Sequence, residues 1–206
     1  MLLWAGLGLI LIGLLCLGVD RAVAHAFYDR VGPRFHTFLE ATTHWAKAAH
    51  WLVGAIVAYG AARWALTRWP GDPPMKWLAD CSLAFIVALG AGSAVLHGMK
   101  LVIGRRRPRD DFEMGLHGFR LFAFNLDHNS FPSGHSLTIF CVAVIATAVL
   151  PKLAIVWFAI AAWLALTRAM LTAHYLSDVF IGAGIGIIAA RETIVYLFPA
   201  LHLAWF

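Results

Sequence analysis

The sequence predicts an all-α integral membrane bundle of about six transmembrane helices, with an interfacial amphipathic segment between the first two. Of the 206 residues, 61% are hydrophobic and only 13% are charged, and the mean hydropathy is +0.77. This balance lies far outside that of a soluble domain. The apolar residues also form long uncharged runs that polar segments separate. A chain of this length suits one compact bundle, so we expect a single domain over residues 1–206.

The first half of the chain contains two expected spans and a surface segment. Residues 2–19 carry no charge and are long enough to cross a bilayer as a helix. A cleaved signal peptide is the alternative, which the lack of a basic residue before this run disfavours. Residues 22–47 mix aromatic, charged and histidine side chains and are expected to lie along the bilayer surface. Residues 48–66 form the second expected span, and residues 67–76, rich in Pro and Gly, form a short connector.

The second half contains four further expected spans, at residues 77–104, 135–150, 153–174 and 176–197. Pro108 is expected to stop the first of them, and residues 110–129 to form one long loop. Gly182, Gly184 and Gly186 in the last span favour close helix packing in lipid over a nucleotide-binding loop.

Charge and cysteine usage narrow the class of protein. The formal net charge is +5, which in a soluble protein would suggest nucleic acid as a partner. Here the basic residues gather beside the expected spans, so an anionic lipid headgroup is favoured and no nucleic acid is expected. Cys16, Cys81 and Cys141 all fall inside apolar runs without metal-ligand spacing, and are interpreted as packing residues.

The segment from Ser130 to Ser136 is the strongest local signal for an anion site. Pro132 and Gly134 shape the backbone just before an apolar run, where a helix is expected to start. The first N–H groups of such a helix are unpaired and would bind an anion beside His135. Alone, the segment is a weak signal, and it favours a serine-capped helix start with an incidental histidine over the anion site.

Two further groups favour the anion site. Lys100 is followed, after six residues, by Arg107 and Pro108, and Arg168 is followed by His174 and Asp178. In this order and spacing the three groups resemble the signature of the type 2 phosphatidic acid phosphatase superfamily. The resemblance covers residues 100–178, with one departure, since Thr167 stands where the family usually has Ser.

The three groups are expected to meet at one face of the membrane. Only a loop separates the first two, and two spans separate the second from the third, which returns the chain to the same side. His174 and Asp178 are four residues apart, so on a continuous helix they would lie on one side and the carboxylate would accept from one imidazole nitrogen. A break near Tyr175 would alter this geometry without preventing contact. The other nitrogen would remain free as a nucleophile.

The resemblance implies a role for each of these residues. His174 would be the nucleophile that forms a phosphohistidine, Asp178 would orient it, and His135 would act as general acid and base. The phosphoryl oxygens would be bound by cations and by the start of the helix, namely Lys100, Arg107, Arg168, the Ser133 hydroxyl and the backbone at Gly134. No metal and no cofactor is expected, because these cations supply the positive charge.

The function expected from the resemblance is hydrolysis of a lipid phosphate monoester or diphosphate, with release of inorganic phosphate. The alternatives are a lipid-to-lipid phosphotransferase that uses the same phosphohistidine, and a lipid-phosphate transporter or binding protein with a silent site. The expected partners are a phosphorylated membrane lipid and the bilayer, with no obligatory protein partner. The resemblance places the site on the periplasmic face of the inner membrane, whereas a count of positive charges on each side favours the cytoplasm.

Overall fold

The structure, a computed structural model, describes residues 1–122 and 128–201. Its elements, in chain order, are α1 (Leu2–Cys16), α2 (Asp20–Arg30), α3 (Pro33–Thr43), the 3-10 turn η1 (His44–Ala46), α4 (Ala48–Arg68), α5 (Pro73–Val102), β1 (Ile103–Arg105), α6 (Pro108–Met114), β2 (Phe119–Leu121), α7 (Gly134–Val149), the 3-10 turn η3 (Pro151–Leu153), α8 (Ala154–Met170) and α9 (Leu176–Leu197). The all-α class is confirmed, with one short strand pair added.

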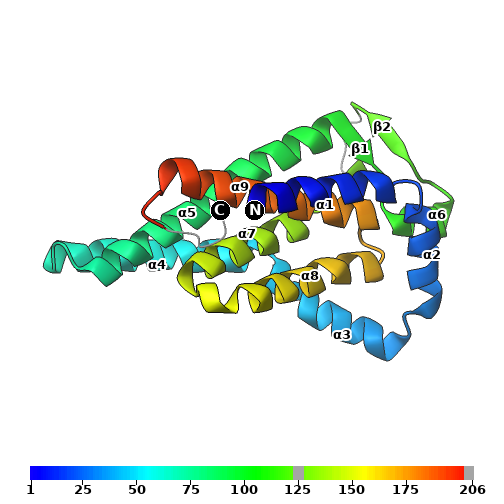
Figure 1. Cartoon of the computed structure of the whole chain (residues 1–206). Helices are drawn as coiled ribbons and strands as arrows, with labels where there is room; N and C mark the ends of the chain where they lie inside the picture. Colours follow the sequence, from blue (N-terminus) through cyan, green and yellow to red (C-terminus); the bar gives the residue numbers. More distant parts are fainter. Residues whose placement is uncertain (123–127, 202–206) are drawn as a thin grey trace.

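Helix α9 lies at the centre of the bundle, in contact with α1, α5, α7 and α8 (Figure 1). Its glycines bring neighbouring backbones close, as the sequence predicts. A Cβ atom added at Gly184 would lie 2.6 Å from the carbonyl oxygen of Gly6 in α1. One added at Gly182 would collide with the carbonyl of Ser133, just before α7. Glycine in α9 therefore lets the start of α7 approach the start of α9, where two of the three sequence groups lie.

Each of the six expected spans corresponds to a helix, namely α1, α4, α5, α7, α8 and α9. Among the described residues, three helices are long and apolar enough to cross a membrane alone, at Pro73–Val102, Pro151–Met170 and Leu176–Leu197. A fourth crossing results if α1 and α2, which are bent by 84°, are counted as one broken span. Helix α7 is apolar but shorter, with 16 residues.

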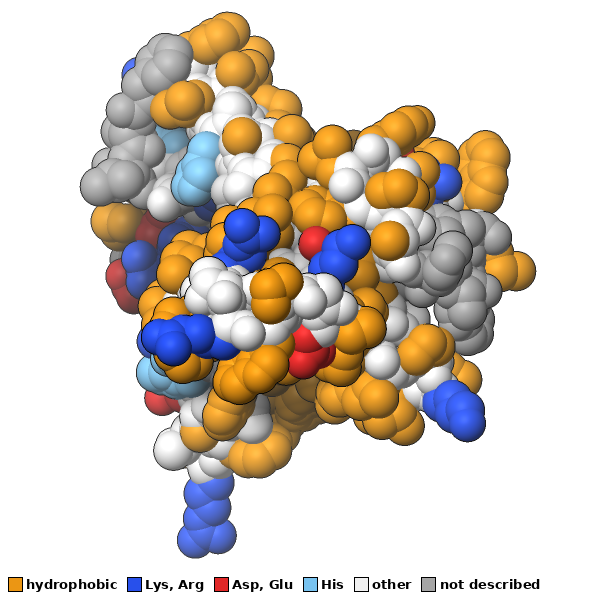
Figure 2. Space-filling model, turned by 90° about the vertical axis from the view of Figure 1, so that its left-hand side faces the viewer, with side chains coloured by type: hydrophobic (Ala, Val, Ile, Leu, Met, Phe, Trp, Pro, Cys, Tyr) orange, Lys and Arg blue, Asp and Glu red, His pale blue; other side chains and the backbone are white. Residues whose placement is uncertain are grey.

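The surface of the bundle is apolar, as expected for a protein in lipid. Large hydrophobic side chains such as Trp4, Leu15 and Ile155 are more than 70% exposed. Figure 2 views the end that carries the α4–α5 turn and shows hydrophobic side chains over much of it, with the charged side chains scattered between them. Exposed apolar surface of this extent would be unfavourable in water. The chain is therefore a membrane protein.

The segment between the first two expected spans folds as two helices and a turn. Helix α2 runs across the end of the bundle, and α3 returns along α8 (Figure 1). Turn η1 then leads into α4, where the indole Nε1 of Trp51 donates to the carbonyl oxygen of Trp45 at 2.6 Å. This segment closes one side of the bundle near the end of α8.

Two expectations for the middle of the chain are wrong. Residues 110–129 are not one loop, because they contain most of α6 and all of β2, although residues 123–127 lie outside the described part. Strand β2 pairs antiparallel with β1, with Arg105 opposite Phe119. Pro108 does not stop the preceding helix, which ends at Val102. It begins α6 instead, at a position where its missing N–H costs no hydrogen bond.

Candidate active site

The segment before α7 is fixed against the start of α9. The Ser133 hydroxyl accepts a hydrogen bond from the Ser136 amide at 3.4 Å, so Ser133 caps α7 as the sequence suggests. The Ser133 amide donates to the carbonyl oxygen of Asp178 at 3.0 Å. Gly134 is the first residue of α7, and a Cβ added there would meet no described atom within 4 Å. The space beside Gly134 is therefore open.

His174 lies in the short turn between α8 and α9. Its amide donates to the carbonyl oxygen of Arg168 at 3.2 Å, and its side chain is 4% exposed. The ring Nδ1 lies 2.8 Å from the carbonyl oxygen of Ser130. Because a carbonyl can only accept, Nδ1 carries the proton of the neutral ring and Nε2 carries the free lone pair.

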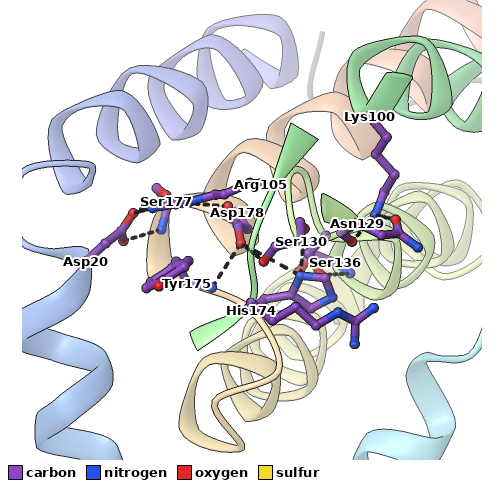
Figure 3. Close-up of polar contacts among 12 residues, drawn as sticks. Asp20, Lys100, Arg105, Asn129, Ser130, Ser136, His174, Tyr175, Ser177 and Asp178 are labelled. Atoms are coloured by element: carbon purple, nitrogen blue, oxygen red, sulfur yellow. Dashed lines mark hydrogen bonds and ion pairs between the residues drawn. The ribbon is translucent and has the colours of Figure 1, made fainter. Parts of the chain in front are cut away.

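Asp178, in the first turn of α9, is completely buried. Its Oδ1 accepts from Arg105 Nη1 at 2.6 Å, and its Oδ2 accepts from the Ser130 hydroxyl at 2.6 Å and from the Tyr175 amide at 3.0 Å (Figure 3). His174 Nδ1 lies 3.8 Å from the same Oδ2, beyond hydrogen-bond distance. Three donors therefore fix the orientation of this carboxylate.

No continuous helix runs through His174 and Asp178, because the chain breaks near Tyr175, the alternative to the helical pairing. Helix α9 begins at Leu176, so His174 precedes the helix and does not share a helical face with Asp178. The imidazole still lies beside the carboxylate, but its hydrogen bond goes to the backbone of Ser130. The segment before α7 therefore orients the histidine directly.

Two of the three predicted cations are held by neutral oxygens. Lys100, near the end of α5, donates through Nζ to the Asn129 carbonyl oxygen at 2.7 Å and to its side-chain Oδ1 at 2.5 Å. Arg168, in the last turn of α8, donates through Nη1 to the Thr43 hydroxyl at 3.3 Å. These bonds leave the charges of both residues without a carboxylate partner among the described residues, so both can turn to an anion.

The third predicted cation, Arg107, immediately precedes α6, and its amide donates to Asp110 at 3.2 Å. The predicted residues interact electrostatically across the three sequence groups. Arg107 acts on both Lys100 and Arg168. His135, half-buried at the start of α7, is acted on by Arg168, His174, Lys47 and Arg107. The structure therefore brings all three groups together at the end of the bundle that carries β1, β2 and α6.

Burial sets the protonation state of the central histidine. Its buried position lowers the pKa of His174 to about 4, although the neighbouring Asp178 acts in the opposite direction. Arg168 and Arg107 also disfavour the imidazolium. His174 is therefore neutral at neutral pH, as a nucleophile requires. Burial and the neighbouring Arg109 likewise lower the pKa of Arg107.

Sequence reasoning missed several residues that hold the site. In the sequence, Arg105 is one of four neighbouring arginines, and Asp20 is the charge that ends the first apolar run. Both are buried, at 5% and 1% exposure. A buried charge needs a partner, so the position of Asp20 at the end of an uncharged run was a usable signal. The roles of Ser130, Asn129 and Thr43 could not be predicted, because they depend on tertiary contacts.

No group of three or more His, Cys, Asp or Glu side chains in the described part of the chain is arranged to hold a metal ion. Two of the apolar cavities beside α7 share Trp45 and Trp51 in their linings. One, of about 500 Å³, lies between α4, α5 and α7. The other, of about 430 Å³, lies between η1, α7 and α8 and reaches Thr42, next to the Thr43 that contacts Arg168.

Solved structures share this fold. LpxE from Aquifex aeolicus has a TM-score of 0.62 and 18% sequence identity, over 86% of this chain and 96% of that one. The first transmembrane PAP2 type phosphatidylglycerolphosphate phosphatase from Bacillus subtilis has a TM-score of 0.61 and 20% identity, over 94% of this chain and 96% of that one. At these sequence identities, the similarity to the two solved structures is evidence for a shared fold alone.

Two curated relatives are more similar in sequence. A lipid A 1-phosphatase of Rhizobium etli is 38% identical over 112 residues, which is 54% of this chain and 47% of that protein. A lipid A 1-phosphatase of Rhizobium johnstonii is 38% identical over 88 residues, which is 43% of this chain and 36% of that protein. The matched segment thus spans at most about half the length of these relatives. Residues 81–201, well over half of the chain and including all three sequence groups, match the PAP2 superfamily. The chain therefore belongs to the PAP2 superfamily, that of the type 2 phosphatidic acid phosphatases.

Proposed function

We propose that this chain is, as a single domain, a membrane lipid phosphatase that hydrolyses a lipid phosphate through a phosphohistidine on His174. The observation that carries the proposal is the hydrogen bond from His174 Nδ1 to the Ser130 carbonyl oxygen, at 2.8 Å. This bond leaves the Nε2 lone pair as the nucleophile of a buried, neutral imidazole among three cations. A buried histidine with a packing role alone would not explain why Arg107 and Arg168 act on it, with Lys100 held at Asn129, next to the Ser130 that orients the ring.

In the first step, His174 Nε2 attacks the phosphorus atom and the bond from phosphorus to the lipid oxygen breaks. The negative charge of the bound phosphate offsets the cations and favours protonated His135. His135 then donates its proton to the leaving alkoxide, so that the lipid departs as a neutral alcohol. The phosphoryl oxygens bind Arg168, Arg107 and Lys100, together with the first N–H groups of α7. These groups stabilise the charge of the transition state more than that of the substrate, because they are already in place.

In the second step, a water molecule attacks the phosphohistidine. His135, now neutral, accepts the proton of that water, and the bond between phosphorus and Nε2 breaks. Inorganic phosphate leaves, and His174 returns to its neutral form with the proton on Nδ1. The same histidine thus serves as acid and then as base, and both steps use the same cations.

The hydrocarbon chains of the substrate are assigned to the cavities beside α7. The smaller cavity reaches Thr42, next to Thr43, which contacts Arg168, so a lipid whose phosphate binds Arg168 can extend into it. The relatives from the two Rhizobium species are lipid A 1-phosphatases, so a lipid A phosphate is the first substrate to test. We place the enzyme in the inner membrane with the site on the periplasmic face.

A panel of purified lipids tests this function, with release of inorganic phosphate as the measurement. The panel contains lipid A, phosphatidate, phosphatidylglycerophosphate and an isoprenoid diphosphate, each in detergent with excess EDTA. We expect release from at least one lipid, with the largest rate for lipid A, and none from His174→Ala. No release of phosphate from any lipid would contradict the proposal, and so would release that occurs only when Mg²⁺ or Zn²⁺ is added. Transfer of the phosphate to a second lipid without release would instead indicate a phosphotransferase.

A further inference from the structure

Arg105 forms a buried bridge between two carboxylates behind the candidate active site. Its Nη1 donates to Asp178 Oδ1 at 2.6 Å and to the Ser177 hydroxyl at 2.7 Å, and its Nη2 donates to Asp20 Oδ2 at 2.8 Å (Figure 3). All three charged side chains are nearly inaccessible, with exposures of 6% or less. The bridge joins the bend between α1 and α2 to the start of α9.

The Arg105 guanidinium makes contacts through its flat faces as well as through its edges. The Cζ atom of Arg105 lies 3.9 Å from the ring centroid of Tyr175 and 4.6 Å from that of Phe119. A planar cation can stack on aromatic rings while its edges donate to two carboxylates, whereas the ammonium of a lysine cannot do both. The site therefore requires an arginine at this position.

Asp20 fixes the other end of the bridge. As the first residue of α2, it accepts from the Ser177 amide at 3.0 Å through Oδ1 and also from the Ser177 hydroxyl. Asp20 thus binds both Arg105 and the first turn of α9, and it is 1% exposed. Because a buried charge is costly when unpaired, Asp20, Arg105 and Asp178 depend on one another.

The charges of the bridge also act on the nucleophile. Asp178 alone would present a full negative charge to His174, whose Nδ1 lies 3.8 Å from Oδ2. Arg105 offsets that charge from the opposite oxygen, and Asp20 in turn offsets Arg105. The other groups that act on His174 are Arg168 in α8, Arg107 before α6 and His135 in α7.

We propose that Arg105 and Asp20 are positioning residues of this site: Arg105 orients the Asp178 carboxylate and offsets its charge, and Asp20 holds Arg105 in place. The inference rests on the proposed function, since its effect passes through Asp178 to His174. Neither residue touches the substrate. Their joint role is to keep His174 oriented without stabilising its protonated form.

The test removes each charge of the bridge in turn and measures phosphorylation of His174 against pH. The variants are Arg105→Gln, Asp20→Asn and the double variant, and the substrate in single turnover is p-nitrophenyl phosphate. Its leaving group departs without a general acid, so the fall in rate at low pH reports protonation of His174. The ionisation of the substrate is the same for every variant, so differences between variants belong to the protein.

We expect the fall in rate at low pH, the acid limb of the pH–rate profile, to shift in opposite directions in the two single variants. Arg105→Gln removes a positive charge, so protonated His174 is favoured and the acid limb moves to higher pH, by about one unit. Asp20→Asn removes a negative charge, so the limb moves to lower pH. The double variant returns toward the wild-type position, because the two charges cancel. The rate on the pH plateau falls in each single variant, by up to about a hundredfold, because Asp178 loses its orientation.

Two controls separate this role from a merely structural one. Arg106→Gln removes the same charge from the next residue, which contacts Asp110 and not the bridge, and should leave the acid limb in place. Arg105→Lys keeps the charge but not the geometry, so the plateau rate should fall while the limb stays. If Arg105→Gln does not fold, Arg105→Lys and Asp20→Asn still give the two readouts.

Equal loss at every pH in all bridge variants, or shifts of the same sign, would overturn the positioning role. The outcome is distinct from failure of the proposed function, in which the wild-type protein itself would form no phosphohistidine. If the wild-type protein is phosphorylated on His174 but the acid limb does not shift in the variants, the role of the bridge is refuted and the proposed function stands.

Discussion

The Nδ1 atom of His174 lies 2.8 Å from the carbonyl oxygen of Ser130, whereas the carboxylate of Asp178 is 3.8 Å away. The backbone that precedes α7 thus fixes the tautomer of the candidate nucleophile, and the same segment leads four residues later to the helix start that carries His135. Asp178 fixes that segment in turn, because it accepts from the Ser130 hydroxyl and its carbonyl accepts from the Ser133 amide. The candidate nucleophile and the candidate acid are therefore held by one hydrogen-bonded unit.

Asp178→Asn should reduce turnover by about a hundredfold, which is at the lower end of positioned acid and base effects. The loss is limited because the Ser130 carbonyl still keeps the proton on Nδ1 of His174. The measurement is steady-state phosphate release, with folding checked by gel filtration in detergent. A loss as complete as that of His174→Ala would show that the carboxylate itself, and not the backbone, maintains the nucleophile.

His135→Ala should slow phosphorylation of the enzyme by a lipid monoester far more than by p-nitrophenyl phosphate. An aliphatic alkoxide needs a proton to depart, whereas the phenolate does not. The single-turnover burst isolates this step from the later hydrolysis, which also needs His135. Equal loss of burst rate with both substrates would mean that His135 only binds phosphate.

Acid should destabilise the fold through His174. Its folded-state pKa of about 4 lies below the value of about 6.5 in the unfolded chain. Between these values the unfolded state binds a proton that the folded state does not, so stability falls as the pH decreases from 6.5 toward 4. His174→Gln removes this contribution. The drop in Tm between pH 7 and pH 5 should therefore be smaller in the variant, and an equal drop in both proteins would contradict the neutral, buried state of His174.

The positions of the helices were predictable because the signal is strong and local. Long uncharged runs predict α1, α5, α8 and α9, and the glycines of α9 predict its close packing. The helix start at Gly134 followed from the residues that precede it. The strand pair was not predictable, since Ile103–Arg105 is extended only because it pairs with Phe119–Leu121.

The candidate site was predictable in its residues but not in its bonds. The spacing of the three sequence groups pointed to Lys100, His135 and His174. Lys100 and His174 contact Asn129 and Ser130, in the segment that leads to the start of α7 and His135. The spacing alone could not show that His174 precedes α9. The break between α8 and α9 depends on the turn in which the His174 amide donates to the Arg168 carbonyl oxygen. The contact between Arg105 and Asp20 could not be predicted either, because 85 residues separate them in the chain.

Thiol labelling tests the predicted sidedness. A cysteine at Glu113, exposed in α6, in a background lacking Cys16, Cys81 and Cys141, should react with an impermeant reagent in intact spheroplasts. A cysteine at Arg68, the exposed last residue of α4, is the matched control and should react only after lysis. The turn from α4 to α5 lies at the end of the bundle opposite to α6 (Figure 1). The reverse pattern would place the candidate site in the cytoplasm, as the positive charges alone favour.

The central claim, a covalent phosphohistidine on His174, is tested most directly by trapping it. Purified protein is mixed with a lipid substrate labelled with ³²P, quenched in alkali within one turnover and digested, and the labelled peptide is sequenced. We expect acid-labile label on His174 that forms before phosphate is released, and no label in His174→Ala. Release of phosphate by the wild-type protein with no label on the chain, or label on another residue, would contradict the account.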